Sequence, residues 1–350
     1  MATALSPRVQ ARPADIVVID DSAVVRTALA RMIDRDDGLR TAAAFGGAAH
    51  AIAWLEYNRV DAILLDINMP GIDGLSAMPA LITAAKGAPI LIVSSAAKDG
   101  AEATVRSLAL GAADTLEKPM AGLGGEFEKM LVRRAGALAR GRRMRAAIVR
   151  EPTALRSAPT IRPQLLALGA STGGIHALES FITALPGDFD APILITQHLP
   201  AAFVPYFTQQ LTQRTGRVAR VASDGMAIER ATITVAPGEA HLGITGTACT
   251  PRVALRDHAV ATRCRPSLDV MLADSADICG AKALAVVLTG MGSDGCEGAR
   301  KLVEAGGHIL AQDAASSTVW GMPGAVARAG LASRLDTPAA LARFVGRLLR

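Results

Sequence analysis

The sequence has few cysteines, few aromatic residues and no long apolar stretch. Its 350 residues include four cysteines, all after residue 248 and none in a C-x-x-C pair, so neither a disulfide framework nor a zinc site is expected, and a reducing cytoplasm fits. The 2 Trp, 2 Tyr and 7 Phe argue against a nucleic-acid reader built on aromatic stacking. No run approaches the ~18–20 apolar residues of a membrane span, and the N-terminus lacks the apolar region of a secretory signal.

Neither sign of charge is in large excess. The 37 basic and 32 acidic residues give a net charge of +5, which is too small to predict nucleic-acid binding over the whole chain. Basic residues are concentrated from Lys129 to Arg150, where no acidic residue occurs. This run fits a patch for nucleic acid or a membrane surface, or a solvated helix end followed by a linker. We favour the second interpretation.

The composition is that of a globular protein of about two domains, since half of the residues are hydrophobic and a domain averages ~150 residues. In the first part of the chain, short apolar runs alternate with stretches of helical period. The runs lack polar alternation, which is typical of strands buried on both faces of a parallel sheet. The pattern predicts an α/β domain over residues 15–133. Its clearest expected strands are Ile16–Ile19, Ala62–Leu65 and Pro89–Val93.

The periodicity fails between about Arg140 and Pro163. This segment is basic and contains three prolines, so we expect an interdomain linker within residues 134–163. A second α/β series follows and predicts a doubly wound, mostly parallel domain over residues 164–350. Its expected strands are Leu165–Leu168, Pro192–Ile195, Ile233–Val235, Leu284–Leu288 and His308–Leu310.

Polar side chains lie at the expected strand ends of the first domain. Asp20 and Asp21 follow the first strand, Asp66 and Ser94 follow two later ones, and Lys118 lies near the fifth strand end. Ligands bind at the carboxyl ends of strands in such sheets. Three carboxylates there repel one another unless a cation lies among them, and oxygen ligands suit Mg²⁺. A lysine and a hydroxyl suit a phosphoryl group, which a carboxylate can itself accept.

Each of these junctions alone fits a helix cap or a turn. The four together, in the order DDS, DINMPGIDG, VSS and KP, resemble a response-regulator receiver domain of flavodoxin-like fold. One departure is Thr115, because receivers often place an aromatic residue three positions before the lysine. The resemblance implies these roles: Asp66 as phosphoacceptor, Asp20 and Asp21 as Mg²⁺ ligands with the backbone carbonyl of Asn68, Ser94 as switch hydroxyl, and Lys118 as phosphate contact.

A glycine-rich turn opens the second domain. The strand Leu165–Leu168 runs into Gly-Ala-Ser171-Thr-Gly-Gly, and a helical stripe follows. One interpretation is a phosphate-binding turn at a helix N-terminus. The other is a serine nucleophile on a tight turn, since the segment contains G-x-S-x-G. The five-residue pattern does not decide between them.

A nucleophilic Ser171 requires a base and a group that orients the base. Of the six histidines, only His198 directly follows a clear strand. Asp294 lies in the glycine-rich segment after the strand Leu284–Leu288, at the same expected sheet edge. The order Ser, His, Asp differs from the Ser, Asp, His order of α/β-hydrolases, so a triad here belongs to a different α/β fold.

The blocks GASTGG, ITQHLP and LTGMGSDG resemble the catalytic domain of chemotaxis protein-glutamate methylesterases, the CheB family. The likeness continues through APGEAHLG, RPSLDVML and WGMPGAV, to about residue 345. It implies hydrolysis of glutamate γ-methyl esters on chemoreceptors, often with deamidation of receptor glutamines. It assigns Ser171 as nucleophile, His198 as general base and acid, Asp294 as orienting carboxylate, the Met291 N–H as oxyanion donor and Thr172 as its neighbour. Cys264 departs from the family, which often has histidine there.

Three hypotheses follow. The first is an esterase controlled by its receiver, with methyl-accepting chemoreceptors as substrate, a CheA-type histidine kinase as phosphodonor, Mg²⁺ in the receiver and no cofactor for the ester chemistry. The second is a non-catalytic adaptor, and the third is a nucleotide- or DNA-binding regulator. Ser171, His198 and Asp294 are all present, which favours the first. We expect no membrane insertion and no nucleic-acid partner.

Overall fold

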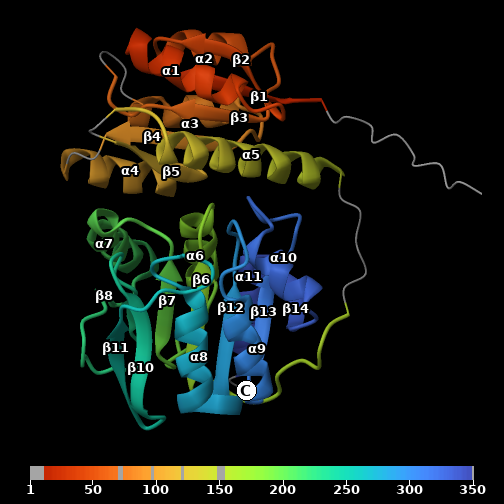
Figure 1. The fold of residues 1–350 in the computed structure, drawn as a ribbon. Helices are drawn as coiled ribbons and strands as arrows, with labels where there is room; N and C mark the ends of the chain where they lie inside the picture. The colour runs from red at the N-terminus through yellow and green to blue at the C-terminus, as the bar shows by residue number, and fades with distance from the viewer. Residues whose placement is uncertain (1–11, 70–73, 96–97, 120–121, 148–153, 349–350) are drawn as a thin grey trace, which may run out of the picture.

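The computed structural model describes residues 12–69, 74–95, 98–119, 122–147 and 154–348. Two parallel sheets, each flanked by helices, lie in two units that face each other (Figure 1). The α/β class is therefore confirmed for both halves. Within the described ranges, no helix combines the length and apolar character needed to cross a membrane.

The first unit is a five-stranded sheet in the order β2-β1-β3-β4-β5, with every neighbouring pair parallel. Its strands are β1 (Ala14–Ile19), β2 (Leu39–Phe45), β3 (Ala62–Leu65), β4 (Ile90–Ser95) and β5 (Asp114–Lys118). Its helices are α1 (Ala23–Asp34), α2 (Ala48–Leu55), α3 (Gly74–Ala84), α4 (Lys98–Leu110) and α5 (Glu126–Ala147).

Apolar side chains cover both faces of this sheet. Leu29 of α1 and Leu131 of α5 pack on one face, while Leu55 of α2, Met78 of α3 and Leu108 of α4 pack on the other. Successive strand residues point to opposite faces, so a strand covered on both sides is apolar without alternation. This is why the three expected strands of the first domain are confirmed.

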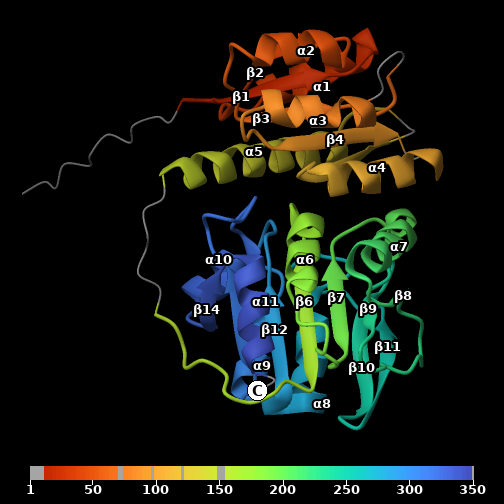
Figure 2. The ribbon, with the colours of Figure 1, turned by 180° about the vertical axis from the view of Figure 1, so that it is seen from behind.

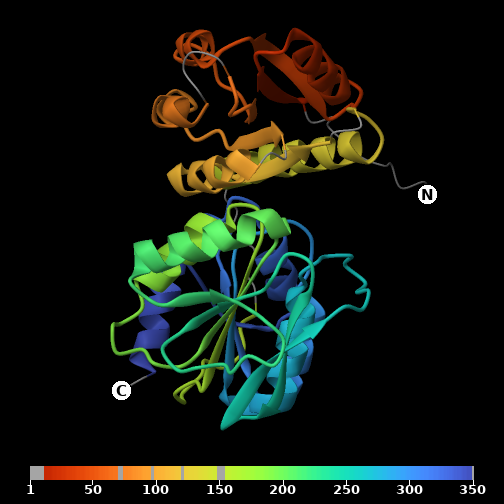
Figure 3. The same cartoon turned by 90° about the vertical axis from the view of Figure 1, so that its left-hand side faces the viewer.

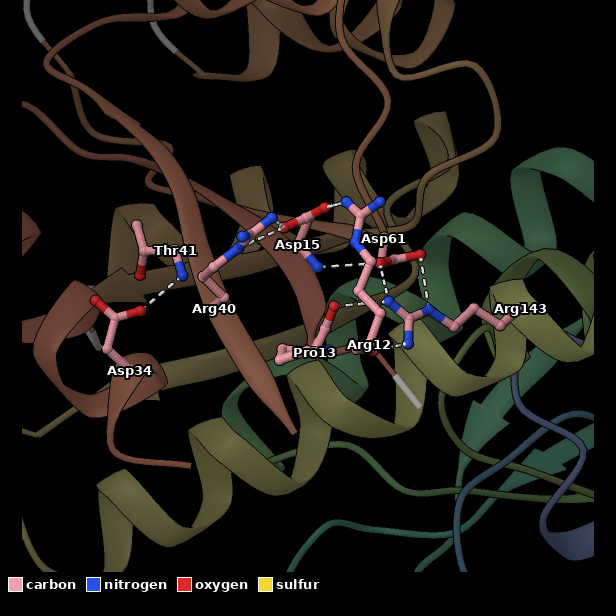
Figure 4. Close-up of polar contacts among 8 residues, drawn as sticks. All are labelled: Arg12, Pro13, Asp15, Asp34, Arg40, Thr41, Asp61 and Arg143. Atoms are coloured by element: carbon pink, nitrogen blue, oxygen red, sulfur yellow. Dashed lines mark hydrogen bonds and ion pairs between the residues drawn. The ribbon is translucent and has the colours of Figure 1, made fainter. Parts of the chain in front are cut away.

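Helix α5 is longer than the sequence pattern indicates. We expected the periodicity to fail near Arg140, but the helix continues to Ala147, inside the segment assigned to the linker. Arg143, near its end, donates to the Asp61 carboxylate at 2.7 Å and to the Pro13 carbonyl at 2.9 Å (Figure 4). Specific partners for the basic residues thus extend the helix where the apolar pattern has weakened. Residues 148–153 of the expected linker lie outside the described residues.

The second unit is a seven-stranded sheet in the order β14-β13-β12-β6-β7-β9-β8, also parallel throughout. Its strands are β6 (Leu165–Ala170), β7 (Ile193–Gln197), β8 (Ala219–Val221), β9 (Ile233–Val235), β12 (Ala283–Val287), β13 (His308–Gln312) and β14 (Ala332–Asp336). A separate antiparallel hairpin consists of β10 (His241–Thr247) and β11 (Thr250–Arg256).

Helices again form a layer on each face of the sheet (Figures 2 and 3). Leu178 and Leu341 lie in the apolar cluster on one face, and Leu272, Leu302 and Val326 lie in the cluster on the other. The helices are α6 (Gly174–Thr183), α7 (Val204–Thr215), α8 (Leu268–Cys279), α9 (Cys296–Glu304), α10 (Met322–Arg328) and α11 (Pro338–Arg347), with 3-10 turns η1 (Ala201–Phe203) and η2 (Gly280–Lys282).

The strands that the pattern missed are edge strands or the hairpin. β2, β8 and β14 lie at sheet edges, and β10 and β11 form the hairpin, in which the first four residues of β10 and only Val253 of β11 are buried. β2 carries one buried residue among seven, and none of the three residues of β8 is buried. Without two covered faces, the apolar run that marks a strand is absent.

Candidate active site

Three carboxylates and one lysine meet at the carboxyl ends of β1, β3 and β5. Lys118 Nζ lies 2.8 Å from Asp20 Oδ2 and 2.7 Å from Asp66 Oδ2. Oxygen atoms of Asp20, Asp21 and Asp66 lie within 4.8 Å of one another. Asp20 and Asp66 are buried, whereas Asp21 is exposed. The structure thus brings these four predicted residues together.

The charge balance of this pocket favours a divalent cation. Burial raises the pKa of Asp20, as does the charge of Asp66, and Lys118 opposes both effects. One ammonium cannot balance three carboxylates, and oxygen ligands with an open, exposed side suit Mg²⁺. The residues present therefore fit this ion. The Asn68 N–H donates to Asp66 Oδ1 at 3.2 Å, which places the Asn68 backbone at the same pocket.

Ser94 and Thr115 lie on the neighbouring strands β4 and β5. Ser94 is buried near the end of β4 and is paired in register with Glu117. The side chain of Thr115 is also buried, and its carbonyl accepts a hydrogen bond from Arg134 of α5. Residues 70–73 of the DINMPGIDG segment lie outside the described residues.

Ser171 lies on the turn between β6 and α6, and its backbone is fixed by hydrogen bonds. Its N–H donates to the Thr289 carbonyl at 3.0 Å, and its carbonyl accepts from Gln197 Nε2 at 3.0 Å. Gly173 has φ +76, a conformation that favours glycine, and a Cβ there would lie 2.3 Å from Thr318 Oγ1. The turn is therefore a rigid strand-to-helix junction.

His198 and Asp294 form a direct hydrogen bond beside this turn. His198 follows β7, where its N–H donates to the Ala170 carbonyl at 3.1 Å. Its Nε2 lies 2.8 Å from Asp294 Oδ2, and Asp294 is 1% exposed. The structure therefore joins the predicted histidine and aspartate across neighbouring loops. Among the described residues, no hydrogen bond joins Ser171 Oγ to His198.

Four donors hold the Asp294 carboxylate. Ser267 Oγ at 2.6 Å and Thr262 Oγ1 at 3.2 Å donate to Oδ1, while the Leu268 N–H donates to Oδ2 at 2.7 Å beside His198. Burial alone raises the pKa of Asp294, but the hydrogen bonds and charge of His198, with the Ser267 and Leu268 bonds, lower it to about 2. Asp294 is therefore ionised at neutral pH, so the His198 nitrogen facing it carries the proton.

Several residues outside the predicted set hold this geometry. Ser267 and the Leu268 N–H come from the start of α8, and Thr289 Oγ1 donates to the Thr172 carbonyl at 2.9 Å. A serine directly before an apolar helix is an N-cap signal, and Ser267 Oγ does accept the Asp269 N–H at 3.2 Å. The cap was readable in the sequence, but its second bond to Asp294 depends on tertiary contact.

Cys264, which stands where the family often has a histidine, lies beside the His198–Asp294 pair. Its sulfur, a His198 ring nitrogen and an Asp294 oxygen lie within 4.8 Å of one another. Burial, with the charge of Asp294, raises the pKa of Cys264 to about 11. The thiol therefore stays protonated at neutral pH and is a poor nucleophile despite the nearby histidine.

The receiver contacts the turn that carries Ser171. The Gly173 N–H donates to the Ala113 carbonyl at 2.6 Å, and Thr172 Oγ1 donates to Asp114 Oδ2 at 2.6 Å. Met291 packs against an apolar cluster that includes residues of α1 and α5 of the receiver together with Val319 of the second unit. Figures 1 and 2 show α5 facing the loops above β6 and β12, while α4 lies over α7 and α6. Both units thus meet directly at the candidate active site.

Comparison with known proteins agrees with this two-part arrangement. Residues 166–345 match the model of the CheB methylesterase family, and residues 16–123 match the response regulator receiver domain. A relative from Azospirillum brasilense, named protein-glutamate methylesterase/protein-glutamine glutaminase, is 38% identical over 92% of this chain and 89% of its own length. A similarly named relative from Paramagnetospirillum magneticum is 36% identical over 91% of each chain.

A solved structure supports the same assignment for the second unit. The crystal structure of the Thermotoga maritima CheB methylesterase catalytic domain has 31% sequence identity and a TM-score of 0.52, and it covers 54% of this chain and 100% of its own. The family model alone spans more than half of the chain. With a receiver domain before its catalytic domain, this chain belongs to the CheB methylesterase family.

Proposed function

We propose that this protein hydrolyses glutamate γ-methyl esters on methyl-accepting chemoreceptors, releasing methanol, and that phosphorylation of its receiver raises the rate. The observation that carries the proposal is the bond of the half-buried His198 to the buried Asp294 next to the turn of Ser171, in a chain of the CheB methylesterase family. Methanol release from methylated receptor, compared between the wild-type chain and Ser171→Ala, tests it. Equal release from both would overturn the assignment.

The mechanism follows from the protonation states. Asp294 is ionised and accepts the proton of His198 Nε2, which leaves Nδ1 as the unprotonated ring nitrogen. His198 Nδ1 takes the proton of Ser171 as Ser171 Oγ attacks the ester carbonyl, and then gives it to the departing methoxide. Water hydrolyses the acyl-enzyme through the same base and leaves a glutamate γ-carboxylate.

The tetrahedral intermediate carries an oxyanion that needs N–H donors. We assign the Met291 N–H to this role, with Thr172 beside the nucleophile. A Cβ added to Gly290 would lie 2.8 Å from Ser171 Cβ, so the loop after β12 approaches the nucleophile closely. The same acyl transfer with ammonia as the leaving group deamidates receptor glutamines, as the names of the relatives indicate for those proteins.

In the receiver, we assign Asp66 as phosphoacceptor. Asp20, Asp21, Asp66 and the Asn68 carbonyl would hold Mg²⁺, which neutralises charge as the phosphoryl group arrives. Lys118 contacts the phosphoryl oxygens, and Ser94 supplies the switch hydroxyl. The phosphodonor is a histidine kinase of the CheA type.

Control of the esterase rests on the contact between the two units. The receiver covers the turn of Ser171, so loosening this contact exposes the site. Residues 155–350 alone should be active without a phosphodonor and faster than the resting full-length chain. An isolated domain no faster than the resting chain would contradict steric inhibition.

A further inference from the structure

A carboxylate and a carbonyl of the receiver are bound by the turn that follows Ser171. Asp114 Oδ2 accepts the Thr172 hydroxyl, and the Ala113 carbonyl accepts the Gly173 N–H, each at 2.6 Å. Asp114 and Ser171 also line the same small cavity between the units. The contact is therefore more specific than a covering surface, because it occupies two hydrogen-bond donors next to the nucleophile.

These two donors suit a carbonyl or carboxylate ligand. Gly173 is the N-cap of α6, where backbone N–H groups and the helix dipole favour negative charge. Thr172 is 4% exposed, and its backbone is fixed by the bond from Thr289. The backbone of the turn is thus held by a bond from within the catalytic domain, which places both donors where a ligand of this kind can reach them.

Asp114 divides its two oxygens between the units. Oδ1 accepts the Thr115 N–H at 2.8 Å and Arg134 Nη1 at 3.1 Å, both within the receiver. Oδ2 is the oxygen that reaches Thr172. Arg134 and Thr115 therefore hold the carboxylate in place and aim its second oxygen at the catalytic turn.

We propose that the Thr172 hydroxyl and the Gly173 N–H form a carboxylate-binding subsite beside Ser171, and that Ala113 and Asp114 occupy it as an internal mimic of the acidic product. The inference rests on the proposed function, whose product is a glutamate γ-carboxylate. In the resting chain Asp114 takes the place of this group. In the open enzyme the subsite receives the glutamyl side chain, so the receiver and the product compete.

Full-length variants test the mimic directly. With acetyl-glutamate γ-methyl ester amide as a small substrate and no phosphodonor, Asp114→Ala should hydrolyse the ester 5- to 150-fold faster than the wild type, the usual range for such coupling. Asp114→Asn, which keeps the shape and loses the charge, should be intermediate. Asp37→Ala, an exposed receiver position, is the matched control and should not change the rate. An Asp114→Ala rate equal to wild type overturns the mimic.

Product binding tests the subsite. Acetyl-glutamate amide should inhibit the Asp114→Ala chain, and adding Thr172→Val should raise the inhibition constant on the order of tenfold, because a hydrogen bond to a charged group is lost. Thr172→Ser, which keeps the hydroxyl, should return the inhibition constant to the value of the Asp114→Ala chain. Equal constants for Thr, Val and Ser overturn the subsite.

Calorimetric titration of acetyl-glutamate amide distinguishes failure of the proposed subsite from failure of the proposed function. The amide should bind Asp114→Ala more tightly than wild type whether or not any ester is hydrolysed. Absence of turnover in every chain, with this binding difference intact, would refute the esterase and leave the subsite standing.

Discussion

The two candidate sites both lie at the carboxyl ends of parallel strands, but their carboxylates have opposite electrostatic surroundings. In the receiver, three carboxylates lie close together with Lys118 paired to two of them, Asp20 and Asp66, and burial raises the pKa of Asp20. In the catalytic domain, Asp294 is surrounded by donors that lower its pKa to about 2. The first pocket is short of positive charge and suits a cation and a phosphoryl group that come and go. In the second, the Asp294 carboxylate is held by four donors, which suits a fixed geometry.

Strand β5 touches both sites. Lys118 at its end contacts Asp20 and Asp66, and Asp114 at its start binds Thr172. Four residue steps in a strand span only about 13 Å. One short strand thus links the carboxylate–lysine pocket to the turn of Ser171.

The largest effect should come from Ser171→Ala in the preorganised site. Loss of a triad nucleophile typically lowers the rate roughly 10⁶-fold. Removal of one hydroxyl at a turn should change stability by about 1 kcal/mol at most. Methanol release measures activity, and labelling of Asp66 by a small phosphodonor is the control that should stay intact. Retention of more than a tenth of the wild-type rate would refute the assignment of Ser171.

Asp294→Asn should be less damaging than His198→Ala, because Asp294 orients the imidazole without transferring a proton. We expect a loss of roughly 10⁴-fold for the aspartate and roughly 10⁶-fold for the histidine. Steady-state rates with the same small ester compare them. Equal losses, or a reversed order, would show that Asp294 has a further role.

Asp66→Asn tests whether phosphorylation of the receiver at Asp66 activates the esterase. With a small-molecule phosphodonor and Mg²⁺, the wild-type chain should become 5- to 150-fold more active, whereas the variant should stay at the resting rate. The charge added to Asp66 is absent in the variant, so nothing favours the open state. Activation of Asp66→Asn by the phosphodonor would exclude this residue as the acceptor.

A smaller effect, on the pH dependence of stability, should follow from replacing Asp269, which lies beside Asp294. Burial, with the charge of Asp294, raises the pKa of Asp269 to about 6. A raised folded-state pKa stabilises the protein below the unfolded value of ~3.9, and that contribution is lost as pH rises through about 6. Asp294 behaves in the opposite sense, because its contribution is full above ~3.9 and is lost as pH falls through about 2.

Asp269→Asn should therefore lower the free energy of unfolding more at pH 4 than at pH 8. The difference in unfolding free energy between wild type and variant should shift by about 1 kcal/mol across this range, after allowance for solvent screening. Urea unfolding at the two pH values measures it. A difference independent of pH would show that Asp269 does not titrate in this window.

The smallest effect is expected for Cys264→Ser, with activity within about twofold of wild type. The thiol lies near His198, but its pKa of about 11 keeps it protonated. Cys249→Ser, at an exposed position, is the matched control. Loss of turnover after alkylation of Cys264, in a chain lacking the other three cysteines, would require a different mechanism.

The parallel α/β class and the polar residues at the strand ends follow from the amino-acid pattern. Central strands such as β3 and β6 are buried on both faces, so their apolar runs appear directly in the sequence. The edge strands and the end of α5 could not be read this way, because pairing at an edge and the Arg143–Asp61 contact do not leave an apolar pattern.

The pairing of the polar residues depends instead on how the two units fold and pack. The position of Ser267 before an apolar stretch predicts a helix cap, but its bond to Asp294 joins segments 27 residues apart. Asp114 and Thr172, 58 residues apart, meet because the receiver packs on the catalytic turn. Local patterns report which face of a strand or helix is buried. They do not predict which donor, distant in the sequence, will bond to a carboxylate, because that depends on how the layers of helices and sheets pack together.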